Sequence, residues 1–293
     1  VLLVAASALA LLAGGRALLR PAELRAVFID VGQGDATLLE LAGGQRILVD
    51  GGGARRQRAG GGVGLRRVIP LLQRRRVRRL DLVVATHAHA DHVRGLLAVL
   101  ARVEVAELWT CAPQGEAERG WFVKLHRLAR RRGVRVRVPR SLRFGDVRIE
   151  PLWPRAGEGG RCGDTSLSTN ENSIVLRVDY GASRLLLTGD IERDAEAALL
   201  SARPRALRAS VVKVPHHGSR TSSSAGFVEA VSPRLAVISC AQHNAFRFPA
   251  GSVLRRYRAA GARVVRTDRQ GAVIVALRRD GTFTWRGTAG GLP

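Results

Sequence analysis

Methionine is absent from the 293 residues, and lysine occurs only at Lys124 and Lys213. Because a translated chain starts with Met, we expect this sequence to be excised or processed from a longer one. Cysteine is also scarce: Cys111, Cys162 and Cys240 are far apart and form no C-x-x-C pair. This spacing argues against a zinc knuckle and predicts no disulfide framework. The cysteines therefore leave the cellular compartment undecided.

Acidic residues are few: 24 Asp and Glu stand against 48 Lys and Arg, which gives a formal net charge of +24. A GC-rich coding bias explains the use of Arg in place of Lys, but it does not explain a twofold excess of bases. An excess of this size favours a polyanionic partner, either nucleic acid or an acidic membrane surface. The arginine runs at 74–76 and 130–132 fit a solvated helix face equally well.

The uncharged run at residues 1–15 is shorter than the roughly 20 apolar residues that a full membrane span needs. Three interpretations compete: the apolar part of a signal peptide, an amphipathic or buried helix, and the tail of a truncated transmembrane helix. A signal peptide normally begins with a basic segment, which this run lacks. We therefore favour the tail of a truncated transmembrane helix, or a linker, for residues 1–20.

Short β-type runs alternate with helix-like segments along the rest of the chain. Helices are expected over 64–77, 93–101, 116–132, 191–201, 221–231 and 250–260. Strands are expected over 24–30, 36–41, 45–50, 81–86, 173–180, 184–190, 210–215, 234–239 and 272–279. Two β-rich halves with interspersed helices predict an α+β protein with two sheets packed face to face and helices outside. Because no convincing linker interrupts them, residues 24–293 are expected to form one domain.

The segment "HAHADH" places four metal-ligand side chains within six residues, directly after an apolar strand. His87 and His89 are two residues apart and point the same way on an extended segment, whereas Asp91 and His92 follow as the chain enters a helix. This arrangement supplies two ligands to one metal ion and two to a neighbouring ion. Imidazole and carboxylate ligands suit zinc or manganese.

Further ligands are expected where later strands end. Asp190 closes "RLLLTGD" and is placed to bridge two ions, although it could also cap the helix expected over 191–201. His216 and His217 follow the strand in "VVKVPHHGS". Two adjacent histidines do not both fit a hydrophobic core, so at least one is expected to bind metal. We expect His217 to be the ligand and His216 to face the substrate phosphate.

The motifs "DVGQGDA", "LVDGGG", "THAHADH", "LLLTGD" and "KVPHHGS" occur in the order found in metallo-β-lactamase-fold hydrolases. Over roughly residues 25–280, the set most resembles the C-terminal domain of ComEC-type competence proteins, the DNA-uptake channels of bacterial inner membranes. Related phosphodiesterases and phosphorylcholine esterases share much of the pattern. The resemblance implies an αββα sandwich of two mixed sheets with outer helices, and two divalent metal ions, Zn or Mn, at one edge. It also implies that the apolar start follows a membrane-embedded channel region.

One position departs from the family pattern. The superfamily supplies a further histidine between H-x-H-x-D-H and Asp190, but the only histidine in that interval is His126, within a helix-like segment. Asn172 and Ser173 stand at the expected place instead. The first metal position is therefore expected to hold only the two histidines of H-x-H and Asp190, and to bind metal weakly or to complete its shell with water.

Other polar residues are expected at the same edge if the resemblance holds. Asp30, Gln33 and Asp35 in "DVGQGD", and Asp50 in "LVDGGG", would lie at strand ends near the metals. Asp30 and Asp50 are expected to orient ligands, although an Asp beside Gly also forms turns without any such role. Ser219 is expected to hydrogen-bond a phosphate oxygen or to cap the following helix.

These observations favour a metal-dependent phosphodiesterase acting on DNA, with Asp91, Asp190 and His216 as its catalytic residues. The arginine excess would hold the phosphate backbone without reading sequence. By resemblance, the domain would degrade the strand that is not imported during natural transformation. It would lie on the periplasmic or extracellular face of the inner membrane, beside the channel region of its parent protein. The alternatives are a metal-dependent esterase of the phosphorylcholine type and a catalytically weak domain that guides DNA to a channel.

Overall fold

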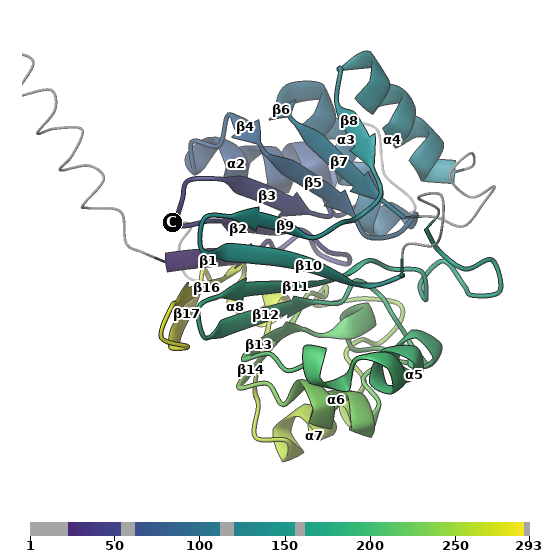
Figure 1. The fold of residues 1–293 in the computed structure, drawn as a ribbon, viewed down its shortest axis with the longest axis vertical. Helices are drawn as coiled ribbons and strands as arrows, with labels where there is room; N and C mark the ends of the chain where they lie inside the picture. The colour runs from purple at the N-terminus through teal and green to yellow at the C-terminus, as the bar shows by residue number, and fades with distance from the viewer. Residues whose placement is uncertain (1–22, 54–61, 112–119, 156–161, 290–293) are drawn as a thin grey trace, which may run out of the picture.

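The computed structural model describes residues 23–53, 62–111, 120–155 and 162–289. The segment expected to be the tail of a membrane helix, residues 1–20, lies outside the described residues. Within the described part, no helix has the length and apolar character needed to cross a bilayer. The described chain forms two β-sheets that face each other between two layers of helices (Figure 1).

The first sheet has eight strands in the order β17-β16-β1-β2-β3-β5-β7-β8. Its strands are β1 (Glu23–Phe28), β2 (Thr37–Glu40), β3 (Arg46–Val49), β5 (Leu82–Ala85), β7 (Glu107–Thr110), β8 (Arg135–Arg137), β16 (Val273–Arg278) and β17 (Phe283–Gly287). Pairing is antiparallel from β17 through β3 and parallel from β3 through β8. The chain therefore leaves β3 and β5 at the same edge of the sheet.

The second sheet has seven strands in the order β15-β14-β13-β12-β11-β10-β9. Its strands are β9 (Leu142–Phe144), β10 (Val147–Trp153), β11 (Val175–Tyr180), β12 (Ser183–Leu187), β13 (Val211–Lys213), β14 (Leu235–Ile238) and β15 (Arg263–Arg266). Pairing is antiparallel from β9 through β12 and parallel from β12 through β15. A separate parallel pair is formed by β4 (Arg79–Leu80) and β6 (Glu104–Val105).

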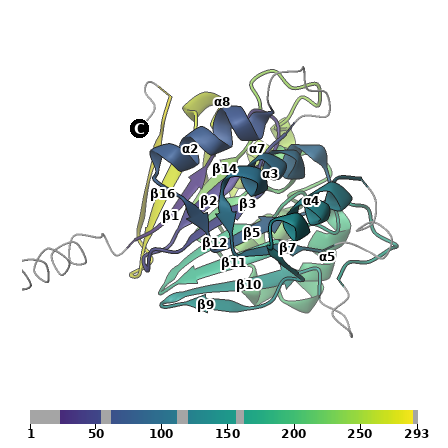
Figure 2. The same cartoon turned by 90° about the horizontal axis from the view of Figure 1, so that it is seen from above.

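Helices cover the outer face of each sheet (Figure 2). Those over the first sheet are α2 (Ile69–Arg74), which continues a π-helical turn at Gly64–Val68, α3 (Ala90–Arg102) and α4 (Gly120–Arg131). Those over the second sheet are α5 (Arg193–Ala202), α6 (Ala225–Val231) and α7 (Gly251–Ala259). The short α8 (Thr267–Gln270) follows β15. The order helix, sheet, sheet, helix is the αββα sandwich expected from the sequence.

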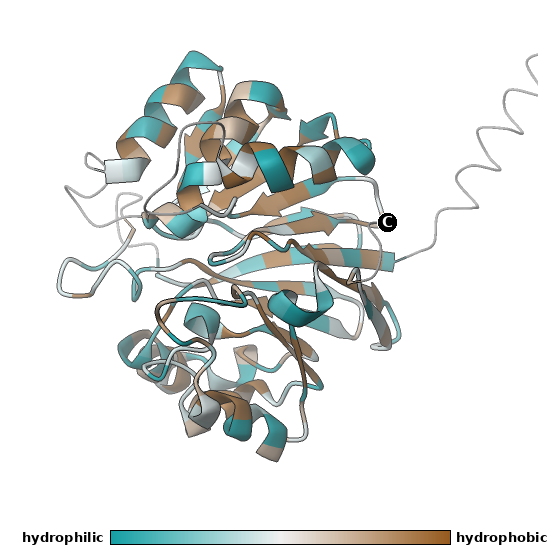
Figure 3. Cartoon of the chain, turned by 180° about the vertical axis from the view of Figure 1, so that it is seen from behind, coloured by the Kyte–Doolittle hydropathy of each residue, from teal (hydrophilic) through white to brown (hydrophobic). Residues whose placement is uncertain are grey.

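Alternation along β1 shows how the layers are held together. Leu24, Ala26 and Phe28 belong to the core between the sheets, whereas Val27 belongs to the core beneath α2, α3 and α4. A third core lies beneath α5, α6 and α7 and includes Phe227. Figure 3 shows the same division, with mostly hydrophobic strands inside and hydrophilic helix surfaces outside. Each sheet therefore has a core on both of its faces. Because complete burial of one large apolar side chain contributes roughly 1.5–3 kcal/mol, these cores hold the layers together.

The expected strands omit β7, β8, β9, β10, β15 and β17 and the short β4 and β6, and one expected strand lies in the other sheet. The strand expected over 272–279, β16, does not stay with the second β-rich half but pairs with β1 in the first sheet. β10 is missing from the expected strands because Pro151 interrupts its pattern. Since β9 pairs only with Val147–Ile149, β10 has a single hydrogen-bonded neighbour at Pro151, and the missing N–H of proline is tolerated there.

A disulfide corrects the expectation drawn from the cysteines. Cys111, directly after β7, is bonded to Cys162 in the loop that leads to β11, with Cα atoms 5.2 Å apart. The two residues are 51 positions apart in the sequence. No spacing rule relates them, and only the folding of that loop against the end of β7 brings them together. Cys240 remains a buried free thiol.

Candidate metal centre

Five loops at one edge of the sandwich carry the polar residues singled out in the sequence. The loop after β5 carries His87 and His89, the loop after β12 carries Asp190, and the loop after β13 carries His216 and His217. The loops after β1 and β3 contribute the "DVGQGD" and "LVDGGG" motifs. The edge therefore gathers side chains that are up to about 190 positions apart in the sequence.

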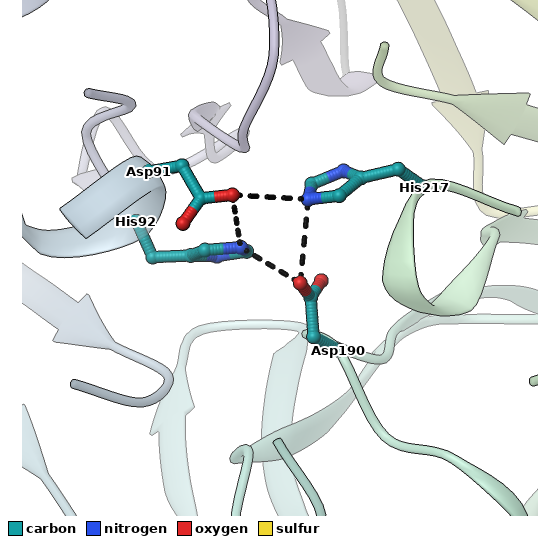
Figure 4. A group of neighbouring side chains, drawn as sticks. All are labelled: Asp91, His92, Asp190 and His217. Carbon is teal, nitrogen blue, oxygen red and sulfur yellow. Dashed lines mark hydrogen bonds and ion pairs between the residues drawn. The ribbon is translucent and has the colours of Figure 1, made fainter. Parts of the chain in front are cut away.

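Four side chains form a tight cluster at this edge (Figure 4). Potential ligand atoms of Asp91, His92, Asp190 and His217 all lie within 4.8 Å of one another. Asp190 Oδ2 lies 3.1 Å from His92 Nε2 and 3.3 Å from His217 Nε2. Asp91 Oδ2 lies 3.6 Å from His217 Nε2. Two imidazole nitrogens and two carboxylates thus converge on one small volume.

Hydrogen bonds to the Nδ1 atoms fix the imidazole rings of His92 and His217. Asp50 Oδ2 lies 2.8 Å from His92 Nδ1, and the same carboxylate accepts hydrogen bonds from the backbone and side chain of Thr86. His217 Nδ1 donates to the carbonyl oxygen of Ser239 at 3.0 Å. Because each Nδ1 is occupied, each Nε2 is directed toward Asp190. This is the arrangement that orients histidine ligands in metal sites.

His87 and His89 form a second group beside the cluster. His87 Nδ1 lies 3.1 Å from Thr86 Oγ1 and 3.2 Å from Ser173 Oγ, and its Nε2 lies 3.1 Å from His89 Nδ1. Ser173 Oγ also accepts a hydrogen bond from the backbone N–H of Asp190 at 3.0 Å. Ser173 therefore links the first histidine of H-x-H to the loop that carries Asp190.

A buried lysine completes the charge pattern, and the sequence analysis missed it. Lys213, on β13, is 2% exposed. Its ammonium group forms an ion pair with Asp35, lies 3.4 Å from Asp190 Oδ1, and donates to the carbonyl oxygen of Gly189 at 2.8 Å. The available signal was a lysine inside the apolar strand "VVKVP" of a chain with only one other lysine.

The pKa values of the buried histidines are shifted in opposite directions. Burial opposes the charged form of His92, yet Asp190 and Asp50 raise its pKa well above the ordinary value. His217 behaves in the same way, because Asp190 and Asp35 overcome its burial and raise its pKa. In contrast, burial lowers the pKa of His87 well below the ordinary value, and the neighbouring charge of His92 adds to this effect.

The acidic partners show the opposite shift. Burial alone would raise the pKa of Asp190, but the charges of His217, His92 and Lys213 hold it well below the ordinary value. The pKa of Asp35 is lowered despite burial, mainly by Lys213 and His217. Both carboxylates therefore remain ionised at neutral pH and can bind a cation.

The adjacent histidines His216 and His217 have strained backbone conformations. In the turn Pro215–Gly218, His216 and His217 have φ angles of 45° and 53°, a region that residues other than glycine seldom adopt. Such strain concentrates at functional sites. His216 Nδ1 lies 2.6 Å from Glu192 Oε1, and its Nε2 lies 4.0 Å from Asp190 Oδ2. His216 thus lies beside the cluster, while His217 lies within it.

The "DVGQGD" loop packs directly on the start of α3. The backbone N–H of Asp35 donates to the carbonyl oxygen of Asp91 at 3.2 Å. A side chain at Gly34, whose φ is 122°, would collide with that carbonyl, so glycine is required there. Asp30 is the first residue of the loop. It accepts a hydrogen bond from the backbone N–H of Gly32 at 3.1 Å, which is a turn-forming contact. Asp35 is thus beside the cluster, and Asp30 stabilises its own turn.

The remaining expected residues are placed as follows. Gln33 lines the cleft and accepts from the backbone N–H of Ala241 at 3.4 Å. Asn172 turns away from the cluster into its own loop, where it accepts from the N–H of Asp164 at 2.7 Å. Ser219 Oγ lies 2.8 Å from Thr221 Oγ1. His126 lies on α4 with its Nε2 3.0 Å from Thr110 Oγ1, outside the cluster.

The cluster opens into a cleft of about 420 Å³. The cleft is lined by Gln33, Ala88, His89, Ala90, Asp91, Trp121, Asn170, Asp190, His216, His217, Phe246 and Phe248. Its polar floor is formed by the residues of H-x-H-x-D-H, the Asp190 loop and the His216–His217 turn. Its walls include three aromatic rings and Asn170.

The sequence model of the metallo-beta-lactamase superfamily matches residues 29–243, which include every residue of the cluster. The chain belongs to the metallo-beta-lactamase superfamily. It is 30% identical to ComE operon protein 3 of Bacillus subtilis, over 87% of this chain and 33% of that protein. It is 32% identical to Competence protein ComA of Neisseria gonorrhoeae, over 88% of this chain and 33% of that protein.

These matches bear out the resemblance to competence proteins, and the chain spans about a third of the length of these relatives. Among solved structures, the fold is similar to that of CmlA, a diiron beta-hydroxylase from Streptomyces venezuelae, with a TM-score of 0.54 at 16% identity. That match covers 88% of this chain and 54% of CmlA. At this identity the likeness concerns the fold alone.

The residues present fit divalent metal ions. The buried His217 Nε2 has no well-aligned hydrogen bond, although Asp190 Oδ2 is 3.3 Å away. Imidazole nitrogen and carboxylate oxygen are the donors that zinc and manganese accept. A cation among these atoms would satisfy the unpaired nitrogen and offset the converging carboxylates. The cluster can therefore hold metal, as membership of the superfamily leads one to expect.

Proposed function

We propose that the domain is a metal-dependent phosphodiesterase that cleaves DNA. The observation that carries this proposal is a cluster of metal-type ligands at the floor of an open cleft whose walls hold aromatic rings. His87, His89 and Asp190 would hold one ion, and Asp91, His92, His217 and the shared Asp190 would hold the other. When bound, two such ions supply activation of water near neutral pH and neutralisation of charge on the phosphate.

His216 and Asp91 take part beside the metals. His216 lies at the cleft with its Nδ1 2.6 Å from Glu192 Oε1 and its Nε2 4.0 Å from Asp190 Oδ2, so Nε2 would face a phosphate bound at the metals. There it can contact a phosphate oxygen or give a proton to the leaving oxygen. Asp91 is the most accessible carboxylate of the cluster and faces His217.

Features of the cleft walls favour nucleic acid as the substrate. Trp121 has the guanidinium of Arg94 5.2 Å and the ammonium of Lys124 4.5 Å from its ring centre. Phe246 is 61% exposed and stacks on Phe248 with ring centres 5.3 Å apart. Exposed rings beside cations are the surfaces on which unpaired bases stack. The net charge of +24 would hold the phosphate backbone independently of sequence.

The biological setting follows from the relatives. One of them is named a competence protein, so we propose that the domain degrades the strand that is not imported during DNA uptake. Residues 24–293 would form the hydrolase domain, and residues 1–20 would join it to the membrane-embedded channel region of the parent protein. The Cys111–Cys162 disulfide supports a place on the oxidising outer side of the inner membrane.

A nuclease assay tests the proposal against its alternatives. The purified domain is incubated with single- and double-stranded DNA in Mn²⁺, Zn²⁺, Mg²⁺ or chelator. We expect cleavage that needs a transition metal and DNA binding that weakens steeply with salt. Hydrolysis of small choline or nitrophenyl esters without DNA cleavage would favour the esterase. Salt-dependent DNA binding without any hydrolysis would favour a domain that only guides DNA.

A further inference from the structure

The loop between Cys162 and β11 is fixed on both sides of a single residue, Asn170. On one side, the Glu171 carboxylate accepts hydrogen bonds from three backbone N–H groups at the start of α5, at 2.8, 3.0 and 3.0 Å. On the other side, the Asn172 side chain donates to three carbonyl oxygens of its own loop, at 2.9, 3.2 and 3.0 Å. With both anchors facing away from the cleft, Asn170 is held between them on the cleft wall.

The side chain of Asn170 faces the metal centre and is incompletely satisfied there. Its Nδ2 lies 3.5 Å from both Glu192 Oε1 and His216 Nε2. It lines the same cleft as His89 and Asp190. Its carboxamide oxygen, Oδ1, is buried and has no hydrogen-bond partner. A buried polar atom without a partner costs about 1–3 kcal/mol, and in native proteins such atoms often mark the place of an ion or water.

The two metal positions differ in their number of protein ligands. One has four candidates, Asp91, His92, Asp190 and His217, all within 4.8 Å of one another. The other would have His87, His89 and the shared Asp190, which together are not one of the groups of described residues whose ligand atoms already lie within 4.8 Å of one another, and the histidine that the superfamily adds is absent from the sequence. We propose that the Asn170 carboxamide oxygen is the fourth protein ligand of this second position. The proposal rests on the metal centre of the proposed function and does not depend on DNA as the substrate.

This ligand would set the metal preference of the position. A neutral amide oxygen is a harder donor than imidazole, and oxygen donors favour manganese, whereas imidazole donors favour zinc. Two histidines with two oxygen donors therefore select manganese more strongly than three histidines with one carboxylate. Asn170 would act as a binding residue for the ion, and its effect is measurable without any substrate.

Metal binding by the purified domain tests this assignment. Isothermal titration calorimetry and electron paramagnetic resonance count Mn²⁺ ions and give their affinities, and competition with Zn²⁺ gives the preference. We expect Asn170→Ala to weaken one of two Mn²⁺ positions by about tenfold or more and to leave the other unchanged. Asn170→Asp should restore binding, because it keeps the oxygen. Asn170→His should shift the Zn²⁺ to Mn²⁺ affinity ratio toward zinc by about tenfold or more.

Gln73→Ala is the matched control, since Gln73 is an exposed amide on α2 that does not line the cleft. It should keep both Mn²⁺ affinities. If Asn170→Ala bound two Mn²⁺ ions with the affinities of the parent protein, the proposal would be overturned. This would hold even if DNA cleavage fell, because the Asn170 oxygen would then contact the substrate rather than the metal. Should Asn170→Ala disturb folding, seen as a lower melting temperature without metal, an unchanged metal preference in Asn170→His would overturn it instead. Absence of DNA cleavage by a parent protein that binds two ions would refute the proposed function alone.

Discussion

Replacing Asp190 by Asn tests the metal centre most directly, because the change keeps the shape of the side chain and removes its charge. Asp190 lies 3.1 Å from His92 Nε2, 3.3 Å from His217 Nε2 and 3.4 Å from Lys213 Nζ. Two unit charges about 3.3 Å apart attract each other by about 5 kcal/mol at an effective dielectric constant of about 20. A hundredfold change in rate requires only about 2.7 kcal/mol. The lost charge is therefore large enough to abolish most of the activity.

We expect Asp190→Asn to lower DNA cleavage by about 10²-fold or more while DNA affinity changes little, since the lost charge acts mainly on the transition state. Cleavage of a fluorescent strand measures the rate, and anisotropy with an uncleavable phosphorothioate strand measures affinity. Asp146→Asn is the control, because Asp146 is an exposed carboxylate that pairs with Arg279 outside the cluster. Cleavage by Asp190→Asn at the parent rate would refute the metal mechanism and favour a domain that guides DNA.

Lys213→Met should lower the free energy of unfolding by about 3–5 kcal/mol in urea titrations, because it leaves two buried carboxylates without their cation; a loss below 1 kcal/mol would contradict this. Protonation of His92 and His217 stabilises the metal-free fold fully below about pH 6.5, and this stabilisation is lost as pH rises through their raised pKa. Calorimetry should therefore show metal affinity rising with pH above about 6.5, with proton release on binding, and a flat profile would contradict the shifts. Phe246→Ala should weaken binding of single-stranded DNA by about 1–3 kcal/mol at unchanged metal content, whereas equal weakening of duplex binding would exclude base stacking. Cys111→Ser should lower stability by roughly 4 kcal/mol for a loop of 51 residues, and a reductant should lower the melting temperature of the parent but not of the variant.

Local sequence pattern was sufficient to predict the scaffold of the site. The apolar run before "HAHADH" predicted β5, and the polar residues after it marked the edge where the cluster lies. The runs that end at Asp190 and at His216 predicted β12 and β13. Each is a short apolar run with a polar end, which is information carried by neighbouring residues. Membership of the sandwich class followed from these repeated units.

Residues that complete the site through long-range packing were not predicted. Lys213 pairs with Asp35 across 178 positions of sequence, and Glu171, in the loop of Asn170, accepts a hydrogen bond from the backbone N–H of Glu192 just before α5. Asn172, which the motif position favoured, instead anchors its loop, while Asn170 reaches the cleft. Asn170 and Asn172 are two positions apart and have the same local pattern. Only the hydrogen bonds of the folded loop show which of the two faces the cleft. The disulfide was missed for the same reason.

Charge balance gives a reason for a buried lysine among candidate metal ligands. Four carboxylates, those of Asp35, Asp50, Asp91 and Asp190, meet at the cluster, and Lys213 offsets one of them. Without metal, protons on the two histidines of raised pKa offset two more, so one negative charge remains. Two divalent ions would displace those protons and bring four positive charges, which leaves the loaded centre with one positive charge. Since a phosphodiester carries one negative charge, the loaded centre would attract it and the metal-free centre would repel it. Without Lys213 the loaded centre would be neutral, so this lysine would give the loaded centre the positive charge that attracts a phosphodiester.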